Sequence, residues 1–203
     1  VALGGECDRP FLRTDAAVTR VLGDAGFPGA EVRVNGFLTD GALHAGRARA
    51  ETYGFLRTGS RHLLAWQLGA DSFLDDLPYS RFALGSDYRL RGYEARALNG
   101  TRILYGSLEQ RFFSSRRILF ASLGAAVFAD AAAAWDEGET LCLGKTRLGA
   151  GFGLRLGGDP AGNSVTRVDL GFGTNSVQVS IASGAFFAAA RPLSHPSLLV
   201  FQQ

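Results

Sequence analysis

Residues 145–156 read Lys-Thr-Arg-Leu-Gly-Ala-Gly-Phe-Gly-Leu-Arg-Leu, and apolar residues alternate there with glycine or charged residues. The apolar set is Leu148, Ala150, Phe152, Leu154 and Leu156, and the opposing set is Lys145, Arg147, Gly149, Gly151, Gly153 and Arg155. Because successive side chains of a strand point to opposite faces, this period predicts a β-strand with one apolar and one polar face.

The same two-residue period recurs along most of the chain. The further segments are 43–56, 61–71, 101–112, 118–135, 163–173 and 176–187, with 31–38 as a weaker candidate. A soluble sandwich would bury the apolar face and wet the polar face equally well. However, strands of about 10 to 13 residues match the 9 to 11 that cross a tilted bilayer better than the usual 5 or 6. We therefore predict an all-β fold, an antiparallel transmembrane β-barrel with about seven or eight strands here.

Segment 118–135 has a competing interpretation, because it is nearly apolar over the length that a membrane-spanning helix requires. Its Ser122, Gly124 and Asp130 make it a poor spanning helix. Its neighbours share the strand period, which no helix would explain, so we expect a strand.

The expected connections alternate between short and long, as in membrane barrels. The short set, 57–60, 114–115 and 157–162, is expected to face the periplasm, and the long set, 75–99 and 131–144, the exterior. A tight turn at 173–175 falls on the nominally long side.

Residues 1–29 form a leader with two alternatives. Asp15 can cap a helix with Val18, Val21 and Leu22 on one face, ended by the Gly-Phe-Pro-Gly at 26–29. The alternative is one more barrel strand and a turn.

Composition excludes several classes of function. The formal charge of the 203 residues is +2, and the basic residues are scattered, so no nucleic-acid partner is expected. The three histidines, His44, His62 and His195, are isolated, and no nucleophile elbow, P-loop or metalloprotease motif occurs. We expect no enzyme activity, no metal and no cofactor. Cys7 and Cys142 lack metal-site spacing and can pair only if both lie in an oxidising exterior. The absence of methionine indicates a processed chain or a fragment.

One loop stands out between the strands: residues 84–94 read Leu-Gly-Ser-Asp-Tyr-Arg-Leu-Arg-Gly-Tyr-Glu. Its core, Leu90, Arg91, Gly92 and Tyr93, resembles the Val/Leu-Arg-Gly-Tyr/Phe lid-loop signature of the BamA, TamA and FhaC superfamily of outer-membrane barrels, also called the bacterial surface antigen family. Residues 128–132, Phe-Ala-Asp-Ala-Ala, match the Phe-x-Asp-x-Gly motif of that family except at Ala132.

The resemblance implies that Arg91 packs inside the barrel against acidic residues of the next strands, here Glu109 and Asp130. A planar guanidinium can bind a carboxylate with two hydrogen bonds. Gly92 would let the backbone turn, and Tyr93 would wedge against the wall. The alternative is an ordinary exterior loop whose charges are Arg89, Arg91 and Glu94.

The resemblance also implies the domain organisation. Residues 1–29 would be the end of a polypeptide-transport-associated (POTRA) domain or an extra strand, 30–187 the barrel region with its lid loop at 75–99, and 188–203 a tail. This barrel region would be part of a larger barrel that has about sixteen strands in full. Phe186 and Phe187 resemble the aromatic signal by which barrels are recognised for assembly.

The implied function is a bacterial outer-membrane component that inserts or translocates polypeptides. Its partners would be outer-membrane lipid, unfolded outer-membrane or secreted clients, and POTRA domains or accessory lipoproteins. The alternative function is a passive pore or structural surface-antigen barrel without insertase activity.

Overall fold

The computed structural model describes residues 11–20, 26–39, 42–74, 81–86, 89–118, 121–157 and 165–184. The long strands are β1 (Phe11–Thr19), β2 (Gly26–Thr39), β3 (Ala42–Gly59), β4 (His62–Phe73), β7 (Arg102–Ile118), β8 (Ala121–Trp135), β9 (Arg147–Gly157), β10 (Val165–Phe172) and β11 (Val177–Gly184). Two short strands, β5 (Phe82–Leu84) and β6 (Leu98–Gly100), lie between β4 and β7, and a 3-10 turn, η2 (Leu143–Lys145), precedes β9. None of the described residues forms a helix long and apolar enough to cross a membrane.

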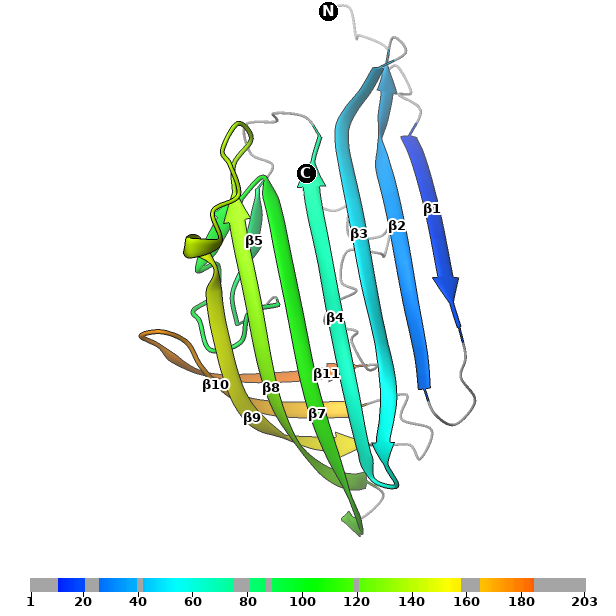
Figure 1. Ribbon diagram of the computed structural model, residues 1–203, viewed down its shortest axis with the longest axis vertical. Helices are drawn as coiled ribbons and strands as arrows, with labels where there is room; N and C mark the ends of the chain where they lie inside the picture. The colour runs from blue at the N-terminus through cyan, green and yellow to red at the C-terminus, as the bar shows by residue number, and fades with distance from the viewer. Residues whose placement is uncertain are drawn as a thin grey trace, which may run out of the picture.

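The long strands form one antiparallel sheet in the order β1-β2-β3-β4-β7-β8-β9-β10-β11, so every strand pairs with its neighbours along the chain. β5 and β6 form a separate two-stranded sheet. Figure 1 shows β1 to β4, β7 and β8 running along the long axis, while β9 to β11 turn across it, so the sheet is strongly curved. Within the described residues β1 and β11 are its two edges and do not pair with each other. The predicted antiparallel all-β fold is confirmed, and the described sheet is open.

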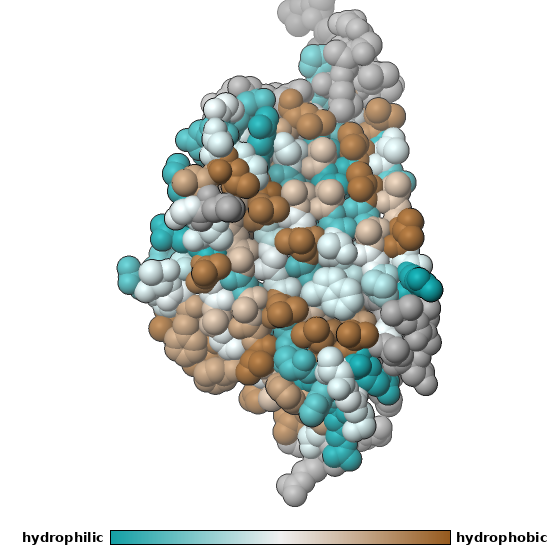
Figure 2. Space-filling model, viewed as in Figure 1, coloured by the Kyte–Doolittle hydropathy of each residue, from teal (hydrophilic) through white to brown (hydrophobic). Residues whose placement is uncertain are grey.

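The two faces of the sheet have opposite character. We call the face that carries Glu109 and Asp130 the inner face and the opposite one the outer face. The outer face exposes large apolar residues: Leu68, Leu108, Val127, Leu148, Phe152, Leu154, Phe172, Val177, Val179 and Ile181. The inner face buries polar ones: Arg49, Gln67, Asp71, Glu109, Arg111, Asp130, Arg155 and Asp169. The predicted alternation is confirmed, with the apolar side turned outward. In Figure 2 apolar side chains spread over the middle of the visible face, and hydrophilic ones gather toward its lower end and left edge.

Several local predictions can be compared with the strands. Ala121–Trp135 is a strand, so the helix alternative for that segment is wrong. Phe11–Thr19 is also a strand, paired with β2, which is the second of the two alternatives for this part of the leader. The turn predicted at 114–115 is wrong, because β7 continues to Ile118 with a register shift between Phe113 and Arg117. A bulge of this kind absorbs extra residues without ending the strand.

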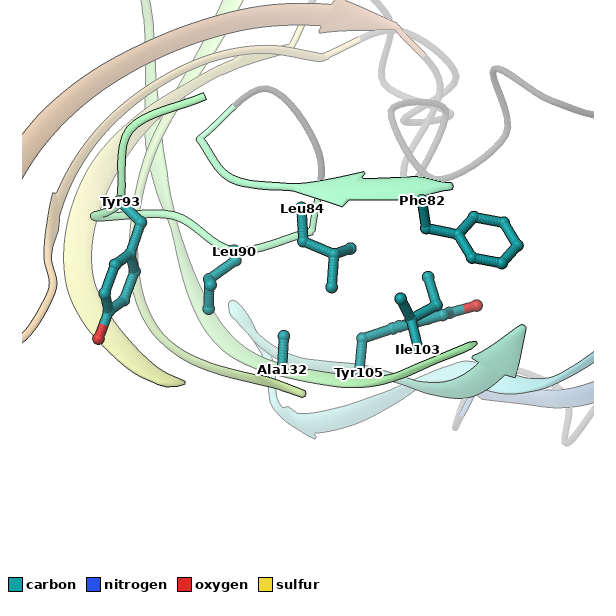
Figure 3. Close-up of a cluster of buried hydrophobic side chains, with 7 residues drawn as sticks. All are labelled: Phe82, Leu84, Leu90, Tyr93, Ile103, Tyr105 and Ala132. Atoms are coloured by element: carbon teal, nitrogen blue, oxygen red, sulfur yellow. The ribbon is translucent and has the colours of Figure 1, made fainter. Parts of the chain in front are cut away.

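The described part of the lid loop contains paired strands. Its described residues, 81–86 and 89–99, include β5 and most of the paired β6, which is completed by Gly100. The main apolar cluster lies between this loop and the inner face: Phe82, Leu84, Leu90, Tyr93, Ile103, Tyr105 and Ala132. Figure 3 shows Leu84 and Leu90 reaching from the loop toward the wall residues Ile103, Tyr105 and Ala132. The loop therefore packs on the inner face of the sheet.

Candidate functional site

The lid loop reaches its docked shape through local backbone hydrogen bonds and positive φ angles, of which two flank Arg91. Arg89 has φ 65° and Gly92 has φ 90°, a left-handed region that favours glycine. The Leu90 N–H donates to the Gly85 carbonyl at 3.1 Å, and the Ser86 N–H donates to the Tyr93 carbonyl at 3.0 Å. From this loop the side chains of Arg89 and Arg91 reach different parts of the sheet, Glu51 on β3 and Asp130 on β8.

Arg91 binds acidic residues of three strands. Its Nε and Nη2 atoms donate to the two carboxylate oxygens of Asp130 on β8, each at 2.8 Å. Its Nη1 atom donates to Glu109 on β7 at 2.8 Å and to Asp169 on β10 at 3.2 Å. Nη2 also reaches the hydroxyl of Ser107 at 3.1 Å. The predicted contacts of Arg91 with Glu109 and Asp130 are thus present, and Asp169 is a third acidic partner.

An aromatic ring completes the Arg91 site. The guanidinium carbon lies 3.5 Å from the centroid of the Phe128 ring, a cation–π distance. The backbone N–H of Arg91 also donates to Asp130 at 3.1 Å, so this carboxylate holds both the side chain and the main chain. Burial by itself lowers the pKa of Arg91, but hydrogen bonding and attraction to Asp130 raise it above its ordinary value. Arg91 therefore remains charged in the docked loop.

Glycines line the part of the wall on which the loop backbone lies. A Cβ atom at Gly149 on β9 would lie 2.2 Å from the Arg91 carbonyl oxygen, and one at Gly171 on β10 would lie 2.5 Å from the Gly92 nitrogen. Gly92 is equally tight, because its Cβ would lie 2.6 Å from the carbonyl carbon of Phe172. These glycines let the loop backbone lie directly on the strand backbones.

Tyr93 fixes the far end of the motif. Its hydroxyl donates to the Leu148 carbonyl at 2.8 Å and lies 2.9 Å from the hydroxyl of Thr174. The hydroxyl of Ser176 donates to the Gly92 carbonyl at 2.6 Å. The predicted tight turn between β10 and β11 thus holds the loop. Tyr93 was predicted to pack against the wall, and there it is buried and makes these hydrogen bonds.

Two of the three carboxylates that bind Arg91, Glu109 and Asp169, also bind wall arginines. Arg155 on β9 lies 2.9 Å from Glu109 and also pairs with Asp169. Arg111 on β7 pairs with Glu109, its neighbour two residues away on the same face. Arg91 therefore enters a network that already contains cations.

Arg89 enters a second cluster on the other side of Tyr105. Its guanidinium carbon lies 3.7 Å from the centroid of the Tyr105 ring, and its Nη2 lies 3.2 Å from Glu51 on β3. The Tyr105 hydroxyl donates to Glu51 at 2.7 Å, the Gln67 amide donates to it at 2.8 Å, and Arg49 donates to it at 2.7 Å. From the sequence, Arg89 was expected only as one charge of an ordinary exterior loop.

The remaining predicted residues lie elsewhere. Phe186, Phe187 and Cys7 are outside the described residues, and Cys142 is exposed without a disulfide partner among them. Over the described ranges no three His, Cys, Asp or Glu side chains gather as a metal site would require. Asp169 and Phe128 were missed as partners of Arg91, although the strand period already put Asp169 on the polar face.

No protein-family model matches this chain, and no curated protein matches it either.

Proposed function

We propose that this chain is wall and lid loop of a β-barrel in a bacterial outer membrane, with the outer face toward lipid and the inner face toward the lumen. The exposed outer face and the buried polar inner face support this proposal. Phe152 is 54 % exposed and Ile181 is 73 % exposed, whereas Asp169 and Arg155 are at most 1 % exposed. A protein surrounded by water would gain by the reverse arrangement. Membrane barrels carry apolar residues outward and polar residues inward.

We further propose that the barrel inserts or translocates polypeptides of the outer membrane, in the manner of the BamA, TamA and FhaC superfamily. The observation that carries this proposal is the docking of Arg91 on Glu109 and Asp130 from a loop that crosses the inner face. A loop locked there guards the lumen, and its release would open a path for a client chain.

The sheet edges supply the second part of such a mechanism. Among the described residues β1 pairs with β2 alone and β11 pairs with β10 alone, so each leaves one side of its backbone unpaired. An unpaired edge can bind an extended client strand through main-chain hydrogen bonds. Unfolded outer-membrane or secreted polypeptides are the clients that this geometry suits.

The membrane location is tested by one substitution on the outer face. Phe152→Arg places a charge on the apolar belt and should cost about 2–4 kcal/mol if that position lies near the bilayer midplane. Asn175→Arg, in the turn between β10 and β11, is the matched control and should cost little. The measurement is urea-dependent folding into phosphatidylcholine vesicles. Equal stability of the two variants would exclude lipid contact at Phe152.

The transport function is tested separately. Vesicles that contain the protein should accelerate the insertion of a second, unfolded outer-membrane barrel, and Arg91→Ala should change that rate. Ion conductance without any acceleration would instead favour the passive pore or structural barrel. If the protein shows neither acceleration nor conductance, only the proposal of a membrane location stands.

A further inference from the structure

We infer that Arg89 is a second positioning residue of the lid loop, a latch on β3 that opens more easily than the Arg91 lock. This inference rests on the proposed role of residues 75–99 as a lid. It concerns how the loop is released rather than what the barrel transports.

The first observation is that the two arginines have equivalent sites. Arg91 binds the carboxylate of Asp130 and stacks on the ring of Phe128. Arg89 lies beside the carboxylate of Glu51 and stacks on the ring of Tyr105, and its side chain is only 3 % exposed. A carboxylate beside an aromatic face is a recognition site for a guanidinium, which is planar and always charged.

The second observation is that the wall is shaped for the Arg89 site. Glu51, Gly69 and Tyr105 lie opposite one another on β3, β4 and β7. A Cβ atom at Gly69 would lie 2.3 Å from the Tyr105 hydroxyl, so only glycine lets this side chain cross β4 to reach Glu51. The ring of Tyr105 then forms the platform on which Arg89 stacks. Gly69 thus makes room for the Tyr105 side chain, as Gly151 does for the ring of Phe128, whose Cζ would lie 2.5 Å from a Cβ atom there.

The third observation is that the two sites differ in what remains after the loop leaves. Glu51 keeps Arg49, Gln67 and the Tyr105 hydroxyl as donors. Asp130, by contrast, has the Ser107 hydroxyl as its other side-chain partner within the described ranges, at 2.7 Å. Because a buried carboxylate that loses its cation is destabilising, release of Arg91 costs more than release of Arg89. The loop should therefore open first at Arg89.

Two amides report on the two sites separately. The Leu90 N–H, bonded to Gly85, lies beside the Arg89 latch, and the Arg91 N–H is bonded to Asp130 itself. Hydrogen exchange at single-residue resolution on the detergent-solubilised full chain measures both. In Arg89→Gln the Leu90 amide should exchange about tenfold faster, while the Arg91 amide and the amides of β7 and β8 keep their protection.

Matched variants make the test specific. Arg96→Gln removes an exposed arginine of the same loop, which also has a positive φ, and should leave Leu90 exchange unchanged. Arg89→Lys keeps the charge without the planar stacking and should restore part of the protection. Combining Arg89→Gln with Glu51→Gln should accelerate exchange less than the product of the two single effects, because both remove one interaction.

Three outcomes would overturn the inference. They are unchanged Leu90 exchange in Arg89→Gln, independent effects of Arg89→Gln and Glu51→Gln, and equal acceleration of the Leu90 and Arg91 amides. None of these depends on lipid or on a client, so they leave the vesicle tests of the proposed function unaffected. Failure of those vesicle tests would likewise leave the exchange result standing.

Discussion

Asp15 on β1 and Asp169 on β10 are both carboxylates that pair with arginines on the inner face of one sheet. Asp15 pairs with Arg13 and Arg33, and its side chain is 34 % exposed. Asp169 pairs with Arg91 and Arg155, and its side chain is 0 % exposed. The lid loop supplies Arg91 to Asp169 on β10, whereas Asp15 on β1 stays partly open to solvent, so the same chemistry is covered at one end of the sheet and more exposed at the other.

Burial beneath the loop, rather than the number of ion pairs, therefore decides how strongly the charges of the inner face interact. An exposed pair gains little, because water already solvates both charges. A covered pair interacts more strongly, but each charge depends on its partner, since an unpaired buried charge is costly. The loop creates this dependence when it docks, because it brings Arg91 and excludes water at once.

The largest effect is expected when the cation that the loop supplies is removed. Arg91→Ala leaves Asp130 buried without a cation and should lower the stability of the docked loop by about 3–5 kcal/mol. Limited proteolysis of the folded protein should then show faster cleavage within residues 84–94. Arg91 takes no part in the strand pairing of the long sheet, so the sheet itself should remain folded.

The control for this prediction is Arg96→Ala, which removes an exposed arginine from the same loop. It should be cut at the rate of the unmodified protein. If Arg91→Ala were cut no faster than Arg96→Ala, the ion network could not be what holds the loop.

A second substitution removes the fit of the backbone while leaving every charge in place. Gly171→Ala puts a Cβ atom 2.5 Å from the Gly92 nitrogen and should cost about 1–3 kcal/mol through overpacking. Gly106→Ala is the matched control on β7, since its Cβ would meet the flexible Leu68 methyl group at 3.4 Å and the Gln67 carbonyl oxygen at 3.8 Å, both ordinary contact distances. Thermal unfolding followed by gel mobility compares the two. Equal melting temperatures would mean that the loop does not need the flat wall.

The strand period alone sufficed for much of the architecture. It placed β7, β9, β10 and β11 and the direction of their faces, because an alternating strand leaves only one choice once one face is buried. It did not place the end of β7, since the serines at 114 and 115 read as a turn whereas a bulge carries the strand on. A local signal cannot show that the partner strand continues.

The site was predicted only in part, for a similar reason. Arg91, Glu109 and Asp130 were identified by a motif resemblance, and the structure brings them together. Arg89 and Glu51 were not connected, because they lie far apart in the chain and each looks like a solvated charge. Their meeting depends on the positive φ of Arg89 and on the missing side chain at Gly69, which only the folded structure shows.

The smallest effect on the free energy of unfolding is expected at Asp15 on β1, at the more exposed end of the sheet. Asp15→Asn breaks exposed pairs with Arg13 and Arg33 and should change the free energy of unfolding by at most about 1 kcal/mol. The same substitution at Asp169 must cost more, because Arg91 and Arg155 lose a buried partner and cannot turn to water. Urea unfolding of both variants in one detergent measures the difference. Equal losses would mean that β1 is covered in solution as β10 is here, and that cover would have to come from a surface outside the described residues.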